Sequence, residues 1–199
     1  MGGIMRSGIV NTYVLKKCKG RKLTEQEIGY LKNGDAKEVV TNFFGVEDRK
    51  YRLFFIAIVK SVCRLMHTDQ LNLTDIRLVN EYESKETASQ IMDGDSDVLL
   101  AVSGNKQAIL KVASCFAQEE FREIDEDVYD SMCEFVNCLN GSFATNLSNE
   151  ANLELSLYPP VFYDRFHVQA EKQMYLSKWE ICGETVEIIM AVNSNWKLQ

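Results

Sequence analysis

Hydrophobic and polar positions alternate with different periods along this chain, and these periods predict its elements. Residues 49–66 are apolar around most of a helical circumference, which predicts a helix that is buried on most sides. A second helix is predicted over residues 105–117, where the helical period returns. Seven segments alternate in the manner of strands, and the last two flank Cys182-Gly183 like a hairpin: residues 75–83, 87–92, 97–102, 152–158, 166–170, 173–181 and 185–192.

The most informative helix is predicted between Asp125 and Gly141. Asp125 suits the N-cap, and Gly141 suits a left-handed stop after the last turn. One stripe of this helix is apolar and faces the predicted core: Val128, Tyr129, Met132, Phe135, Val136 and Leu139. The opposite stripe is polar and is predicted to face solvent: Asp127, Asp130, Ser131, Glu134, Asn137 and Asn140.

The order of these elements is helix, strands, two helices and strands, with Asp93-Gly94-Asp95 as a turn between two of the strands. This order predicts an α+β fold, in which a long antiparallel sheet has its helices packed on one face. Residues 1–45 are patterned differently, with short helices predicted around 24–33 and 36–43. We interpret residues 1–45 as a helical extension of unknown role and residues 46–199 as the main domain.

Composition and charge argue for a globular domain and against nucleic-acid or membrane partners. The 199 residues are 46% hydrophobic and 26% charged, as in an ordinary globular domain, and the net charge is -7. An acidic chain has no overall attraction for phosphate backbones, so we expect no nucleic-acid partner. We interpret the short basic cluster at residues 16–22 as a solvated tail rather than a nucleic-acid or membrane patch. The longest apolar run, residues 53–59, is too short to span a bilayer, and we expect no membrane partner.

The cysteines and histidines argue against a zinc site. None of the six cysteines forms a CxxC pair, and His67 and His167 are far apart in sequence. Cys133 and Cys138 have no basic neighbours in sequence that would lower a thiol pKa, so we interpret them as inert thiols. Together with the absence of a signal-peptide pattern, unpaired thiols predict a reduced cytoplasmic setting.

Glu134 and Asn137 are the candidate chemical pair. Their i, i+3 spacing places a carboxylate and a carboxamide side by side on one helix face. Such a pair is common by chance, and on spacing alone a hydrated helix face is the simpler interpretation. The sequence has neither a GxSxG elbow nor a glycine-rich phosphate loop.

The surrounding residues give the pair more weight. The run DVYDSMCEFVNCLNGSFATNL, followed by LELSLYPPVF, resembles the CheC/CheX/FliY family of chemotaxis phosphatases, and CheX most closely. Glu134, Asn137 and Gly141 occupy the three positions of the family signature. Leu155, Leu157 and Pro159 or Pro160 fit the leucine-rich strand that follows it. The resemblance covers roughly residues 50–193.

The resemblance implies a CheC-like fold and a phosphorylated CheY-type response regulator as partner and substrate. Asn137 would orient the attacking water, and Glu134 would pair with the lysine of the receiver. Magnesium would come from the receiver, so no cofactor or metal ligand of this chain's own is expected. The resemblance also implies a homodimer.

Residues 51–66 lack a second Glu-x-x-Asn, so one active centre per chain is expected. Residues 161–168 lack the glycine expected after the strand.

Two other functions stay open on the sequence alone. The domain could be a non-catalytic module that binds a receiver, a partner chemotaxis protein or its own copy through the same face. A metal-free hydrolase of a small phosphorylated molecule fits less well, because an open helix face suits a protein partner better than a small ligand.

Overall fold

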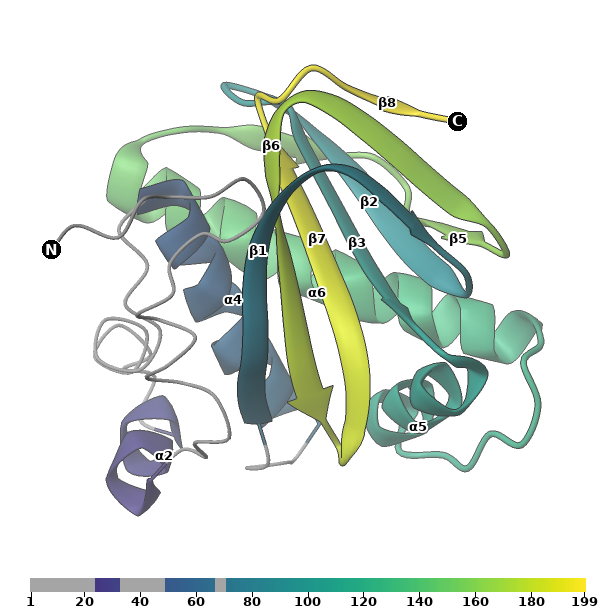
Figure 1. Ribbon diagram of the computed structural model, residues 1–199. Helices are drawn as coiled ribbons and strands as arrows, with labels where there is room; N and C mark the ends of the chain where they lie inside the picture. Colours follow the sequence, from purple (N-terminus) through teal and green to yellow (C-terminus); the bar gives the residue numbers. More distant parts are fainter. Residues whose placement is uncertain (1–23, 33–48, 67–70) are drawn as a thin grey trace, which may run out of the picture.

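The computed structural model describes residues 24–32, 49–66 and 71–199 (Figure 1). Its helices are α2 (Glu25–Lys32), α4 (Arg49–Leu65), α5 (Lys106–Ala117) and α6 (Glu126–Ala151). Its strands are β1 (Leu71–Ser84), β2 (Thr87–Gly94), β3 (Val98–Gly104), β4 (Leu155–Leu157), β5 (Val161–Tyr163), β6 (Phe166–Ile181), β7 (Glu184–Val192) and β8 (Trp196–Leu198). The basic cluster at 16–22 and the helix predicted at 36–43 lie outside the described residues.

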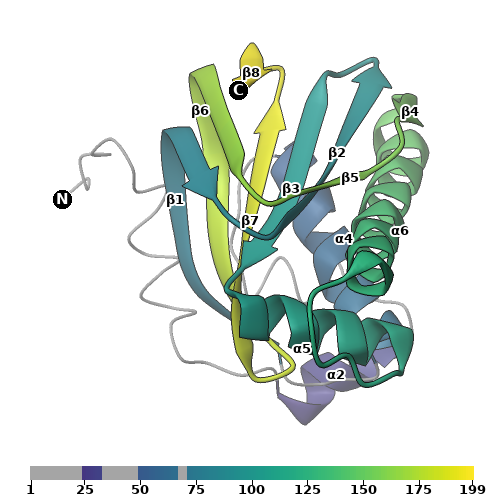
Figure 2. The same cartoon turned by 90° about the vertical axis from the view of Figure 1, so that its right-hand side faces the viewer.

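The strands form one antiparallel sheet of eight strands. Its order is β1-β6-β7-β3-β2-β4, with β5 also paired to β2 and β8 to β6. Figures 1 and 2 show α4 and α6 together on one face of this sheet, with α5 at its end. The predicted α+β arrangement is therefore confirmed.

The main core lies between the sheet and the helices. Every residue from Leu53 to Val59 is buried, which confirms the prediction for this helix. Phe54 of α4 meets Phe143 of α6 edge to face, with 5.8 Å between ring centroids, and Phe55 contacts Trp179 of the sheet. These contacts hold α4 against both α6 and the sheet, because buried aromatic rings contribute a large contact area in a core.

A second apolar cluster fills the opposite face of the sheet. It includes Tyr82, Phe166 and Val168, from paired segments of β1 and β6, together with Leu99 of β3 and Ile189 of β7. Figure 1 shows β1 and β6 bending strongly along their length. This bend lets the two long strands cover part of their own sheet, and both faces of the central strands are consequently buried.

Two strand predictions need correction. The segments predicted at 166–170 and 173–181 are one strand, β6, whose pairing with β1 breaks register between Val79 and Glu81. Asn80 bridges the irregular stretch, since its Nδ2 donates to the carbonyls of Ala170 at 3.2 Å and Glu171 at 3.4 Å. The strand predicted at 152–158 shortens to β4. Sequence patterning missed β5 and β8, which are only three residues each.

The turn predicted at Asp93-Gly94-Asp95 is present. Gly94 has a φ of +141°, and a Cβ there would collide with the carbonyl oxygen of Glu154. Only glycine fits this backbone without strain.

Helix α6 is longer than predicted. It passes through Gly141 and ends at Ala151, where Asn152 adopts the left-handed cap conformation with a φ of +53°. The apolar stripe continues beyond Gly141 with Phe143 and Leu147, both buried. Burial of these two side chains outweighs the cost of one helical glycine, which is roughly 0.5–1 kcal/mol.

Helix α2, from the extension predicted at residues 1–45, contacts α4 and so rests on the main domain. The helices of the described residues are all too short or too polar to cross a membrane.

Candidate functional site

The candidate pair lies on α6 where this helix passes over β2. Asp125 starts the helix as predicted, since its Oδ1 accepts from the backbone N–H of Val128 at 3.2 Å. Glu134 is exposed and Asn137 is partly exposed. Both side chains are therefore accessible from outside the chain, as a docking role requires.

Glu134 and Asn137 meet as the spacing predicts. The Nδ2 of Asn137 donates to Oε2 of Glu134 at 3.2 Å. The Oδ1 of Asn137 accepts from Nε2 of Gln90 at 2.9 Å. The carboxamide is thus held from two sides, by a surface carboxylate and by a buried amide of β2.

The buried side of this arrangement was not predicted. Gln90 is 2% exposed and Asn140 is fully buried. The Nδ2 of Asn140 donates to Oε1 of Gln90 at 2.8 Å. Gln90 Nε2 also donates to the backbone carbonyl of Tyr158 at 2.7 Å. The signal for Gln90 was a polar residue between Ala88 and Met92 on the inward side of an apolar strand.

The prediction that Asn140 faces solvent was wrong. Three residues turn a helix by about 300°, so each i+3 step falls short of a full turn by about 60°. The row of Glu134, Asn137 and Asn140 therefore winds around α6. It is exposed at its first member, half-covered at its second and buried at its third.

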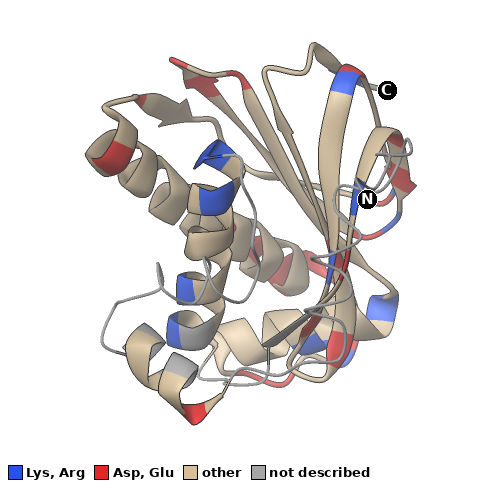
Figure 3. Ribbon diagram, turned by 60° about the vertical axis from the view of Figure 1, so that its left-hand side comes forward, with Lys and Arg blue, Asp and Glu red and all other residues tan. Residues whose placement is uncertain are grey.

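The electrostatics of the two long helices are opposite. The acidic residues of α6 are Glu126, Asp127, Asp130, Glu134 and Glu150, and it has no Lys or Arg. Helix α4 has no Asp or Glu but carries Arg49, Lys50, Arg52, Lys60 and Arg64, and Figure 3 shows basic residues along it. The face that presents Asn137 is consequently acidic, in keeping with a basic partner surface.

Four cysteines are free thiols: Cys115, Cys133, Cys138 and Cys182. Burial raises the pKa of Cys133, and burial together with the nearby Glu134 carboxylate raises the pKa of Cys138. Burial also raises the pKa of Cys182. Thiols with raised pKa values are poor nucleophiles at neutral pH, which supports the interpretation of Cys133 and Cys138 as inert.

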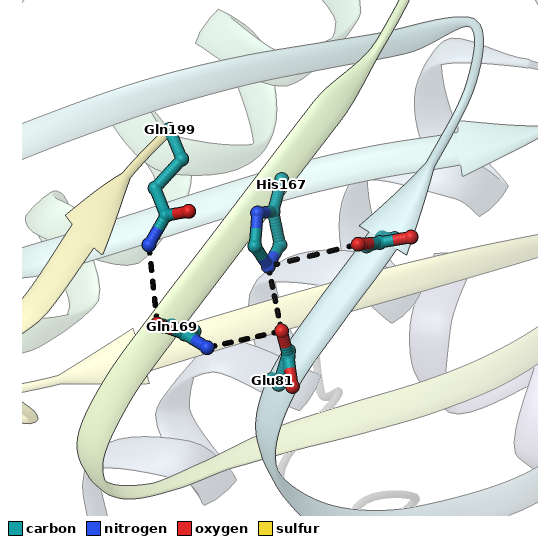
Figure 4. Close-up of polar contacts among 5 residues, drawn as sticks. Glu81, His167, Gln169 and Gln199 are labelled. Atoms are coloured by element: carbon teal, nitrogen blue, oxygen red, sulfur yellow. Dashed lines mark hydrogen bonds and ion pairs between the residues drawn. The ribbon is translucent and has the colours of Figure 1, made fainter.

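One group among the described residues could hold a metal ion, and it lies away from α6 on the paired strands β1 and β6 (Figure 4). His167 Nε2 is 2.8 Å from Oε1 of Glu81 and 3.8 Å from Oε1 of Glu83. Gln169 Nε2 donates to the same Glu81 oxygen at 3.0 Å. Here the three potential ligands are engaged with one another. Their separation in sequence hid this cluster from pattern reasoning.

A family comparison covers the region that contains the candidate pair on α6. A family model described as "Chemotaxis phosphatase CheX" matches residues 87–181, a range that includes Gln90, Glu134, Asn137 and Gly141. No curated protein matches the chain.

Solved structures share the fold. The chemotaxis protein CheX from Desulfovibrio desulfuricans is 14% identical, with a TM-score of 0.62, and the match covers 73% of this chain and 99% of that one. A CheC-like superfamily protein from Shewanella is 16% identical (TM-score 0.60, covering 74% and 99%). A chain of the CheX–CheY–BeF3–Mg complex from Borrelia burgdorferi is 15% identical (TM-score 0.60, covering 73% and 98%).

Proposed function

Because residues 87–181 match the family model of the chemotaxis phosphatase CheX, we propose that this chain is a member of that family and hydrolyses the aspartyl phosphate of a CheY-type response regulator. The observation that carries this proposal is the partly exposed Asn137 carboxamide, held beside exposed Glu134 on the acidic face of α6. An amide at this place can enter a neighbouring protein's pocket without bringing another negative charge next to a phosphoryl group.

In the proposed reaction, Asn137 orients water for in-line attack on phosphorus. The P–O bond to the aspartyl carboxylate breaks, and the water oxygen ends in inorganic phosphate. Asparagine suits this task because its Oδ1 accepts from water and its Nδ2 donates to it. Phosphoryl transfer needs little covalent assistance, so positioning of the nucleophile supplies a large part of the rate.

Glu134 has the proposed role of fixing the docked position. Its exposed carboxylate would pair with the receiver lysine that otherwise contacts the phosphoryl group. On docking, Glu134 would exchange its contact with Asn137 Nδ2 for this ion pair, which would leave that amide hydrogen free to face water. Magnesium would remain with the receiver, where it neutralises charge on the phosphoryl oxygens. One structure similar in fold was solved as a CheX–CheY–BeF3–Mg complex, and this supports the choice of partner.

The decisive experiment compares phosphate release from a phosphorylated receiver and magnesium, alone and with this protein. We expect wild type to accelerate release, and Asn137→Ala to reduce kcat by a factor of at least about 100 while receiver binding persists, because positioning of water is lost. Asn149→Ala is the matched control, since Asn149 is exposed on the same helix at its other end. It should behave as wild type.

Full activity in Asn137→Ala would refute the assigned mechanism. Binding of the phosphorylated receiver without any acceleration by wild type would favour the non-catalytic interaction module instead.

The proposal extends to a homodimer, as the family resemblance implies. Light scattering on the full chain tests this, and a monomeric mass across the working concentration range would refute it.

A further inference from the structure

The hydrogen bonds behind Asn137 form an ordered chain that begins at a backbone group. The carbonyl oxygen of Tyr158 can only accept, so the Gln90 atom 2.7 Å from it must be the donor Nε2. The same Nε2 lies 2.9 Å from Asn137, which must therefore present its acceptor, Oδ1. A backbone carbonyl cannot flip as an amide can, and it fixes the direction of both side-chain amides in turn.

Two further contacts agree with this direction. Gln90 Oε1 accepts from Asn140 Nδ2 at 2.8 Å, which holds the other end of the Gln90 amide. On the surface side, Asn137 Nδ2 faces Oε2 of Glu134, an acceptor. The backbone carbonyl of Tyr158 at one end of this series of hydrogen bonds and the Glu134 carboxylate at the other therefore require the same orientation of the Asn137 carboxamide.

Burial makes this arrangement costly unless its bonds are made. Gln90 is 2% exposed and its neighbours on the same strand face, Ala88 and Met92, are fully buried apolar residues. An amide buried without partners loses several kcal/mol relative to water, whereas an apolar side chain would pack there at no such cost. A methionine at position 90 would avoid that cost for its own side chain, but it would leave Asn140 Nδ2 and the Tyr158 carbonyl without their partner. Packing alone therefore does not account for the amide, which links these two groups to Asn137.

We propose that Gln90, held by Asn140, is a positioning residue that keeps the Asn137 carboxamide aimed outward for hydrolysis of the aspartyl phosphate. This inference rests on the proposed function. When Glu134 turns to the receiver lysine, Asn137 loses its surface contact, and its hydrogen bond with Gln90 remains. One lone pair of Oδ1 stays bound to Gln90, while the other lone pair and both hydrogens of Nδ2 become available to water.

Gln90→Met tests the proposal because it conserves volume and removes both donors. We expect kcat for receiver dephosphorylation to fall between about tenfold and a hundredfold, with KM within about a factor of two, since the surface that docks is unchanged. Ser89→Ala is the matched control. Ser89 is also buried on β2 and donates to the Leu100 carbonyl at 3.0 Å, but it lies on the opposite face of the strand.

Gln90→Glu gives a readout that a purely structural role would not move. An ionised carboxylate cannot donate to Asn137 or Tyr158, whereas the protonated acid regains one O–H donor. The ratio of variant to wild-type kcat should therefore rise as pH falls. Asn140→Ala should also lower kcat, but by a smaller factor than Gln90→Met, since it removes one contact that holds Gln90 and leaves the donor Nε2 of Gln90 in place.

The outcomes separate the two proposals. Wild-type kcat in Gln90→Met, or a change confined to KM, overturns the positioning role and leaves Asn137 in place as the catalytic residue. A pH-independent ratio for Gln90→Glu also counts against it. Failure of wild type itself to accelerate phosphate release overturns the proposed function, and the positioning role falls with it.

Discussion

Gly141 lies four residues after Asn137 and therefore on the same side of α6. No heavy atom of the described residues comes within 4 Å of the position that a Cβ would occupy there, apart from the backbone of the helix itself. A glycine inside a helix costs roughly 0.5–1 kcal/mol relative to alanine. Since packing does not require glycine at this position, clearance for a docking partner gives it a physical reason.

Replacing this glycine should separate stability from function. We expect Gly141→Ala to raise the free energy of unfolding by about 0.5–1 kcal/mol in urea titrations, because the helix gains propensity and no clash arises. The same variant should raise KM for the phosphorylated receiver, with kcat at saturation largely kept, because the added methyl group lies beside Asn137. A more stable variant with an unchanged KM would show that clearance is not the reason for this glycine.

At the same scale, the sequence predicted part of the site and missed part of it. The contact between Glu134 and Asn137 follows from local helix geometry, which spacing alone determines. Gln90 comes from a strand 47 residues away in sequence from Asn137, and no local rule brings the two together. The residue type of Asn140 favours exposure, but its side chain lies in the core, where its Nδ2 donates to Oε1 of Gln90.

At the scale of elements, boundaries set by local contacts were predicted correctly, and boundaries set by long-range contacts were not. The start of α6 was predicted because an N-cap is a local hydrogen bond, here from Val128 N–H to Asp125. Its end was not, because Gly141 is a local stop signal that tertiary burial of Phe143 and Leu147 overrides. The continuity of β6 depends on its pairing with β1 across an irregular register, which a single strand's pattern does not reveal.

The pairing of β1 with β6 should depend on pH through Glu81. Hydrogen bonds from His167, and next from Gln169, lower the pKa of this carboxyl from its ordinary value of 4.5. A carboxyl group whose pKa is lower in the folded state than in the unfolded state stabilises the fold at pH values above its unfolded-state pKa. This stabilisation is lost as the pH falls through the folded-state pKa. Because Glu81 is exposed, the effect should be small and weakened by salt.

The test compares the free energy of unfolding of wild type and Glu81→Gln from neutral pH down to about pH 3. Wild type should be the more stable protein at neutral pH, and the difference should shrink below the ordinary carboxyl pKa. Glu119→Gln, at an exposed residue after α5, controls for the loss of one negative charge. A difference that stays constant over the whole range would show that the contact with His167 does not stabilise the strand pair.

At the scale of the whole molecule, the distribution of charge matters more than its sum. The net charge of -7 would repel a strongly acidic partner, but α4 is basic and the acidic residues of the candidate face belong to α6. Four of the five acidic residues of α6 lie between its start and Asn137, at Glu126, Asp127, Asp130 and Glu134. Their field extends over about one Debye length, roughly 10 Å at 0.1 M salt, and would guide a basic patch of a receiver toward Asn137.

Association with the receiver should therefore be sensitive to salt. We expect the association rate to fall several-fold as ionic strength rises from about 0.05 M to 0.5 M, while kcat at saturating receiver changes little, because screening acts on encounter rather than on the docked geometry. Glu134→Gln and Glu119→Gln both change the net charge from -7 to -6. Only the first removes a charge from the docking face, so stopped-flow binding should show a shallower salt dependence for Glu134→Gln than for Glu119→Gln. Equal slopes for the two variants would mean that the acidic face of α6 does not guide the receiver.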